Sequence, residues 1–232
     1  MIIDPSSIDY WNQCTYQRDG YFDGITRTSE IPLDDGDKLR QYVASGFETR
    51  DNGVPGESLY TELKMLSGLL AGKRVLDFGC GQGIDSFYLA RQGAIVSSVD
   101  IVPSNIALVD EILTWHKHSV HLLGNYSEIE GLGEFDFILS NGCLHHIQED
   151  RVVGVLRDLL GRLNNGGLFL AMVYTEEFYP EPNAAKNLPE GPWARGYSVE
   201  EFLELIGKGM QILSHRTLCY GGFQWFLCRK CE

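Results

Sequence analysis

A glycine-rich segment and a nearby acidic residue could together form a ligand-binding site. Residues 79–83 hold glycine at every second position and come directly after a short apolar run, residues 75–78. Glycine allows the backbone to approach a ligand closely. A second apolar run, residues 95–99, ends in Asp100, whose carboxylate could accept hydrogen bonds from both hydroxyls of a ribose. The pattern therefore indicates a nucleoside site.

The spacing of the glycines separates two classes of nucleoside cofactor. A dinucleotide fingerprint needs a third small residue at the position that Ile84 occupies here. Asp77 also places a carboxylate close to the loop, where it would be unfavourable beside a pyrophosphate and favourable beside a cation. S-adenosylmethionine has a ribose, a sulfonium and an ammonium group but no phosphate. The segment therefore favours S-adenosylmethionine over a nicotinamide dinucleotide. It disfavours a nicotinamide-dependent dehydrogenase.

Several segments in order along residues 60–228 resemble class I S-adenosylmethionine-dependent methyltransferases of the small-molecule type. The segments that carry this resemblance are residues 75–83, 99–101, 135–140, 144–147 and 163–168. Each segment alone is a weak signal, but all of them in order at workable spacings make a strong one. The resemblance implies that the chain uses S-adenosylmethionine as its cofactor.

Strand and helix patterns alternate along most of the chain. The expected strands are residues 74–78, 95–100, 120–123, 135–140, 168–173, 211–219 and 223–229. The link between the last two strands is short enough only for an antiparallel pair. The sequence therefore predicts an α/β fold, Rossmann-like, with a seven-stranded mostly parallel sheet, one antiparallel strand and helices on both faces. Residues 1–57 are expected to form an N-terminal cap or substrate lid. Residues 58–232 are expected to form the S-adenosylmethionine-binding methyltransferase domain, with an insert at 174–197.

Ligands in open α/β sheets bind beyond the carboxyl ends of the strands. The resemblance implies that Asp77 and Gly79 face the amino-acid end of the cofactor, that Asp100 holds the ribose and that Ile101 packs on the adenine. Asn125 stands where the family often has an acid, and its side-chain oxygen could accept from the adenine amino group. The expected cofactor-binding residues are Asp77, Phe78, Gly79, Cys80, Gly81, Asp100, Ile101, Asn125, Tyr126, Ser140 and Asn141.

His145 and His146 follow the expected fourth strand and are the candidate catalytic residues. Methyl transfer is an in-line displacement, and the protein mainly positions the nucleophile and excludes water. A base that takes the proton of a hydroxyl nucleophile could add about 10²–10⁴-fold to the rate, and histidine suits this role near neutral pH. We expect one of the two histidines to face the substrate and the other to hold structure or the cofactor. The sequence does not distinguish between them.

No metal site is expected. His116, His118 and His121 straddle a helix end and a strand start, so their side chains are not expected to converge on a zinc ion. The final C-x-x-C pair, Cys228 and Cys231, lacks the second pair that zinc would need.

Composition limits the partners of the chain. A formal net charge of −13 disfavours nucleic acid, which proteins bind through clustered lysine and arginine. The N-terminus lacks the pattern of a signal peptide, and no run approaches the roughly 20 apolar residues of a membrane helix. We therefore expect a cytoplasmic protein with reduced thiols, no nucleic-acid or membrane partner, and a monomeric or homodimeric state.

The methyl acceptor is expected to be a small molecule. Residues 140–143 lack the Asn-Pro-Pro-Tyr type of run found in enzymes that methylate base amines, which favours oxygen over nitrogen. Aromatic residues in segments 1–57 and 174–197 could line its pocket. They are Tyr10, Trp11, Tyr16, Tyr21, Phe22, Tyr174, Phe178, Tyr179 and Trp193. The alternative function is a non-catalytic S-adenosylmethionine or S-adenosylhomocysteine binder that regulates or scaffolds a partner.

Overall fold

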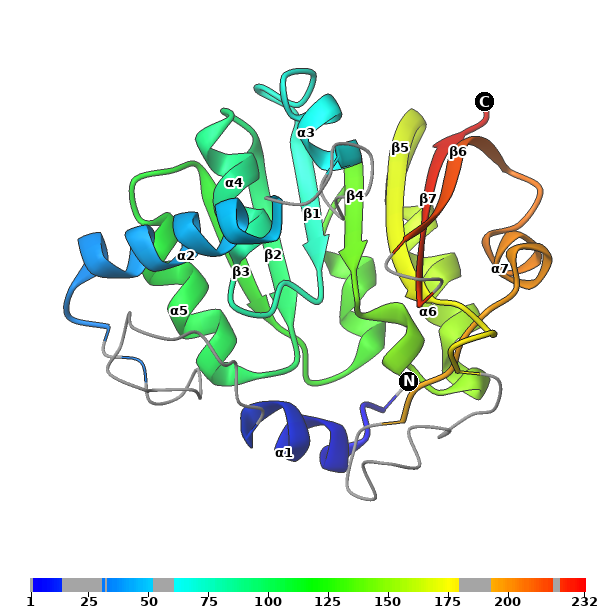
Figure 1. Cartoon of the computed structure of the whole chain (residues 1–232), viewed down its shortest axis with the longest axis horizontal. Coiled ribbons are helices and arrows are strands. Elements are labelled where there is room, and N and C mark those ends of the chain that lie inside the picture. The colour runs from blue at the N-terminus through cyan, green and yellow to red at the C-terminus, as the bar shows by residue number, and fades with distance from the viewer. Residues whose placement is uncertain (1, 14–30, 32, 52–60, 180–192, 219–221) are drawn as a thin grey trace.

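The computed structural model describes residues 2–13, 31, 33–51, 61–179, 193–218 and 222–232. Within these residues a seven-stranded sheet has helices on both faces (Figure 1). The strands are β1 (Arg74–Phe78), β2 (Ile95–Asp100), β3 (His118–Leu122), β4 (Phe135–Asn141), β5 (Leu163–Tyr174), β6 (Met210–Leu218) and β7 (Phe223–Lys230). Their order across the sheet is β3-β2-β1-β4-β5-β7-β6.

Only β7 runs against its neighbours in this sheet, since it pairs antiparallel with both β5 and β6 while the other strand pairs are parallel. The predicted Rossmann-like sheet with one reversed strand is therefore confirmed. β1 has β2 on one side and β4 on the other. The chain thus changes direction across the sheet at β1, and such a point leaves a crevice at the carboxyl ends of the strands.

The helices form two layers around the sheet. The α-helices are α1 (Pro5–Gln13), α2 (Gly36–Asp51), α3 (Thr61–Ser67), α4 (Ile84–Arg91), α5 (Pro103–Leu113), α6 (Glu149–Gly161) and α7 (Val199–Ile206). The described part of the chain also has two short 3₁₀ turns, η2 (Tyr126–Gly131) and η3 (Leu144–His146). Helices α2 to α5 share one apolar core cluster, and α6, α7 and η2 share the other. Strand residues alternate between these clusters, as in Val75 and Leu76, because successive side chains point to opposite faces.

The predicted boundaries are close but not uniform. β1 and β2 have the predicted bounds, whereas β5 begins at Leu163 rather than at residue 168. Leu163 already pairs with Phe135 of β4, and Asn164 Nδ2 donates to Asp136 Oδ1 at 3.1 Å. The expected turn is therefore part of an irregular strand, in which Gly166 has a φ of 74°.

The N-terminal residues take two different positions. Helix α1 lies below the sheet in Figure 1, at the end towards which the arrowheads of β1 and β4 point. Helix α2 instead packs against α4 and α5, with Leu39 and Val43 fully buried in that layer. Thus α1 lies at the carboxyl edge of the sheet, while α2 belongs to a helical layer. Tyr16, Tyr21 and Phe22 and most of the insert lie outside the described residues.

Gly83 allows α4 to pack closely on α5. Its φ is 75°, and a Cβ there would lie 2.6 Å from Val109 Cγ2 and 3.0 Å from Ile112 Cδ1. We expect Gly83→Ala to lower the free energy of unfolding by about 1–3 kcal/mol, through overpacking and backbone strain. Urea denaturation measures this change. The control is Gly161→Ala at the end of α6, where a Cβ meets nothing within 4 Å. Equal losses in the two variants would contradict the packing role.

Candidate active site

A cavity of about 460 Å³ lies at the carboxyl ends of β1, β2 and β4. Ser7 and Trp11 of α1 contribute to its wall, so this helix covers the crevice. The predicted cofactor residues that line it are Phe78, Gly79, Cys80, Gly81, Asp100, Ile101, Tyr126 and Asn141. Both candidate catalytic histidines, His145 and His146, line the same cavity.

The glycine loop and the acid at the end of β2 are in direct contact. The backbone N–H of Gly81 donates to Asp100 Oδ2 at 2.8 Å, and the N–H of Val102 donates to Oδ1 at 2.9 Å. Asp100 is 8% exposed and lines the cavity. Burial raises the pKa of its carboxyl above the ordinary value. The two elements that the sequence singled out therefore form one wall.

Gly79 fits tightly against the end of β4. Its φ is 78°, and a Cβ at this position would lie only 2.4 Å from Cys143 Sγ. The N–H groups of Gly79 and Cys80 both donate to Val99 O, at 2.8 and 3.0 Å. These bonds hold the loop between β2 and β4 and leave its backbone exposed to the cavity.

Asp77 lies beneath the loop and is not part of the cavity wall. Its Oδ2 accepts a hydrogen bond of 2.6 Å from Ser86 Oγ, which also lies 2.8 Å from Ser98 Oγ. Burial, together with the charges of Asp85 and Asp100, raises the pKa of Asp77 to about 8. The carboxylate of Asp77 is therefore not placed to touch a ligand in the cavity, whereas the sequence predicted a contact with the amino-acid end of the cofactor.

Asp85 is the acid that lines the cavity on this side, and sequence reasoning missed it. Its Oδ2 accepts a 2.7 Å hydrogen bond from Asn141 Nδ2, which joins the first turn of α4 to the end of β4. The position of Asp85 in the sequence could have indicated this role. The first helical turn after a glycine loop lies at the same edge of the sheet as the loop, and Asp85 is in that turn.

Two other predicted cofactor residues do not line the cavity, namely Asn125 and Ser140. Asn125 Oδ1 accepts from both Ser127 N and Ser127 Oγ at 3.0 Å, so the oxygen expected to meet an adenine amino group caps η2 instead. Ser140 is fully buried within β4. Tyr126, which follows Asn125, does line the cavity.

The side chain of His146 is oriented by the insert. Its Nδ1 lies 3.1 Å from the backbone oxygen of Trp193, which can only accept, so Nδ1 carries the proton. In the neutral ring Nε2 then has a free lone pair. Burial lowers the pKa of His146 to about 4, which keeps the ring neutral at physiological pH.

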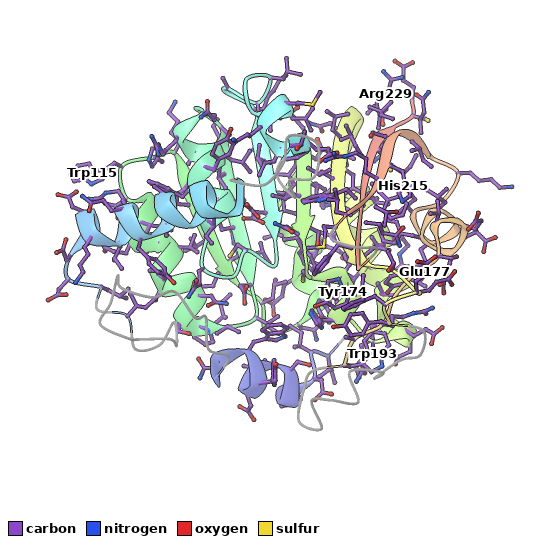
Figure 2. All side chains as sticks on the ribbon, in the orientation of Figure 1. Trp115, Tyr174, Glu177, Trp193, His215 and Arg229 are labelled. Carbon is purple, nitrogen blue, oxygen red and sulfur yellow. The ribbon has the colours of Figure 1, made fainter. Side chains whose placement is uncertain are left out.

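His145 is buried between two rings. Its ring centroid lies 3.7 Å from that of Tyr174 in a stacked arrangement and 4.2 Å from that of His146. Burial holds the pKa of His145 well below its usual range, so this ring is also neutral. Figure 2 shows that Tyr174 and Trp193, which contact the two histidines, lie at the end of the molecule that faces α1.

The described residues contain no group of three or more His, Cys, Asp or Glu side chains that could hold a metal ion. His118 Nε2 instead lies 3.0 Å from Asp110 Oδ1, and its Nδ1 lies 3.0 Å from His116 O. Among the helices that the structure describes, none combines the length and apolar character needed to cross a membrane.

A family model described as a methyltransferase domain matches residues 54–219 of the chain. The chain belongs to this methyltransferase family. The match includes the glycine loop, Asp100 and both histidines of the cavity. It confirms the resemblance to class I S-adenosylmethionine-dependent methyltransferases, and S-adenosylmethionine is the cofactor of that family.

Curated relatives of this chain match it over part of their own length. The magnesium-protoporphyrin O-methyltransferase of Rhodobacter capsulatus is 32% identical over 135 residues, which are 57% of this chain and 56% of that protein. The probable S-adenosyl-L-methionine-dependent methyltransferase TehB of Haemophilus influenzae is 29% identical over 136 residues, which are 56% of this chain and 47% of that protein. The chain therefore spans about half the length of these relatives.

Solved structures share the fold of this chain. The crystal structure of TehB from Haemophilus influenzae has a TM-score of 0.62 and 22% identity, covering 81% of this chain and 67% of that chain. A 1,6-didemethyltoxoflavin-N1-methyltransferase from Burkholderia thailandensis, with that compound and S-adenosylhomocysteine bound, has a TM-score of 0.59 and 21% identity. The match covers 88% of this chain and 93% of that one. At these identities the similarity concerns the fold.

Proposed function

We propose that the chain transfers a methyl group from S-adenosylmethionine to a small-molecule acceptor, more readily at oxygen than at nitrogen. The observation that carries this proposal is the contact between the glycine loop and Asp100. The loop and Asp100 line the same cavity as His145 and His146, whose rings are neutral. An O-methyltransferase among the relatives supports a small acceptor and transfer to oxygen.

The chemistry of the cavity fits S-adenosylmethionine. Asp100 would hold the ribose, because an ionised carboxylate can accept from both hydroxyls of a diol. Ile101 and Tyr126 offer an apolar wall for the adenine. Asp85 on the wall supplies negative charge for the ammonium and sulfonium groups, and Asp77 beneath it adds to this charge once the pH rises above about 8. Gly79, where a Cβ would meet Cys143, keeps the loop close to the β4 end.

His146 is the residue that we assign as the general base. When bound, S-adenosylmethionine supplies an electrophilic methyl group on its sulfonium sulfur. The Nε2 lone pair of His146, fixed by the bond from Nδ1 to Trp193 O, would take the proton of the acceptor hydroxyl as its oxygen forms the new bond to the methyl carbon. His145, held against Tyr174, would orient His146 and exclude water.

The affinity of the site for the sulfonium charge is expected to depend on pH. Raising the pH through about 8 ionises Asp77 and adds negative charge beside the cavity. S-adenosylhomocysteine lacks the sulfonium charge but has the same amino and carboxyl groups. The ratio of the affinity for S-adenosylmethionine to that for S-adenosylhomocysteine should therefore rise about threefold to tenfold between roughly pH 7 and 9.

Isothermal titration calorimetry with both ligands measures this ratio. Asp77→Asn, which keeps an oxygen that can accept from Ser86, is expected to remove the rise. A ratio that stays constant in the wild type, or that rises equally in the variant, would contradict the role of Asp77.

Transfer itself is tested with S-adenosylmethionine carrying a labelled methyl group. The chain is incubated with this cofactor and a small-molecule metabolite extract, and the labelled products are separated. Label in a methyl ether of a small molecule is the expected result. Clear binding of the cofactor with no label transferred would instead support the non-catalytic binder.

A further inference from the structure

The wall of the cavity beyond the cofactor residues consists of aromatic rings in contact with one another. The ring of Trp11 lies 4.9 Å from that of His146 at an angle of 71°. The rings of His145 and Tyr174 are stacked at 3.7 Å, and Phe223 lies 5.1 Å from Tyr174. All five residues line the cavity. We call these five residues the aromatic wall.

Tyr174 is fixed within the aromatic wall. His145 covers one side of its ring, and Tyr179 stacks on it with the centroids 4.2 Å apart and an interplanar angle of 18°. A ring held between two others can present its edge to a ligand. Because the edge of an aromatic ring is positive and the face of another ring is negative, this arrangement favours a flat aromatic ligand.

The charges around the cavity are unfavourable for an anion. Asp85 and Asp100 line it, and none of the described lining residues is lysine or arginine. Arg195 lies behind His145 but is paired with Glu149 and Glu201. A carboxylate or phosphate group of an acceptor, buried against the aromatic wall, would therefore lose its hydration without gaining a cationic partner among the described lining residues.

The polar atoms of the aromatic wall suit a hydroxyl group. His146 Nε2 can accept a hydrogen bond, because its Nδ1 donates to Trp193 O. The Nδ1 atom of His145, by contrast, is buried and has no hydrogen-bond partner among the described residues. His146 Nε2 is therefore the polar atom of the aromatic wall that we expect an acceptor hydroxyl to contact.

We propose that the methyl acceptor is an uncharged, planar aromatic compound that presents a ring hydroxyl to His146 and bears no carboxylate, sulfate or phosphate group. This inference rests on the proposed function, since it concerns the acceptor half of the same cavity. The transfer then joins the hydroxyl oxygen to the methyl carbon, while the carbon–sulfur bond breaks and the proton goes to His146.

The test compares binding of matched ligands to the chain saturated with S-adenosylhomocysteine. One set contains methyl 4-hydroxybenzoate, 4-hydroxybenzoate and methyl 4-hydroxycyclohexanecarboxylate, and a second set has the same groups on a two-ring skeleton. Calorimetry is expected to show that the aromatic ester binds at least about tenfold more tightly than the acid or the saturated ester in one set or both. Tighter or equal binding of the acid or the saturated ester would overturn the proposal.

Binding of S-adenosylhomocysteine is measured first, and this step separates two kinds of failure. If S-adenosylhomocysteine does not bind, the proposed function itself fails. If it binds while no member of either set does, the proposed function stands and the assignment of the acceptor class is wrong.

A pair of tryptophan variants tests the aromatic wall directly. Trp11→Leu should weaken binding of the aromatic ester about tenfold and leave the affinity for S-adenosylhomocysteine within about threefold of the wild type. Trp115→Leu is the matched control, since Trp115 is 78% exposed and does not line the cavity. Equal affinities for the aromatic ester in the two variants would overturn the proposal.

Discussion

Replacing His146 with alanine should lower kcat by about 10²–10⁴-fold and leave the affinity for S-adenosylhomocysteine within about threefold of the wild type. The expected loss is that of a positioned base, because Trp193 O fixes the ring with Nε2 as the acceptor. Single-turnover transfer of labelled methyl groups measures the rate, and calorimetry measures the affinity. The rate should be restored in part by added imidazole.

The pH dependence of the wild-type activity is a second test of His146 as the general base. Since burial lowers the pKa of His146 to about 4, the base stays neutral as the pH falls through 6 and becomes protonated only near 4. We therefore expect activity of the wild type to decline towards that pH rather than near the ordinary histidine value. His121→Ala, on β3 and away from the cavity, is the control. A rate for His146→Ala within threefold of that of the control would contradict the assignment.

Replacing Asp100 with alanine should weaken binding of S-adenosylhomocysteine by at least about 100-fold. Each hydrogen bond to a charged group contributes about 1.5–3 kcal/mol, and the carboxylate is expected to accept two from the ribose. It also accepts from Gly81 N and Val102 N, so its loss should loosen the glycine loop as well. Asp100→Asn keeps an acceptor oxygen and should show a smaller loss of affinity. Calorimetric titration measures both variants.

The control for Asp100 is Asp110→Ala, which removes an exposed carboxylate that pairs with His118 outside the cavity. Thermal unfolding of each ligand-free variant shows whether the fold is retained. If Asp100→Ala is folded and binds S-adenosylhomocysteine as tightly as Asp110→Ala does, the ribose is held elsewhere.

The sequence predicted the centre of the sheet well. β1 and β2 have the predicted bounds because each is a short apolar run that a glycine segment or an acid ends. The same local pattern predicted that the loop and Asp100 meet. Ser198 also caps α7 by accepting from Glu201 N, and the spacing of a serine three residues before a glutamate is typical of such a cap. Features of this kind depend on residues that are close together along the chain or on the general rule for parallel sheets.

The details of the site depend on contacts that periodicity does not encode. Asp77 and Asp85 are both acids beside the glycine loop, but only Asp85 lines the cavity, because Asp77 turns towards Ser86 of α4. The bond between His146 and Trp193 joins residues 47 positions apart. Trp11 reaches the cavity from α1, which is far along the chain from β1, β2 and β4, the strands whose ends form the cavity. By contrast, the cap formed by Asn125 is local, and its Asn-x-Ser spacing could have indicated it.

Binding of S-adenosylhomocysteine at the wall formed by Gly81 and Asp100 is the event on which every role proposed for this site depends. Thermal unfolding of the wild-type chain with saturating S-adenosylhomocysteine, and separately with NAD, tests it most directly. At about 100 times its dissociation constant, S-adenosylhomocysteine should add about 2.7 kcal/mol to the free energy of unfolding, and NAD should leave the transition unchanged. A clear shift with NAD and none with S-adenosylhomocysteine would contradict the account.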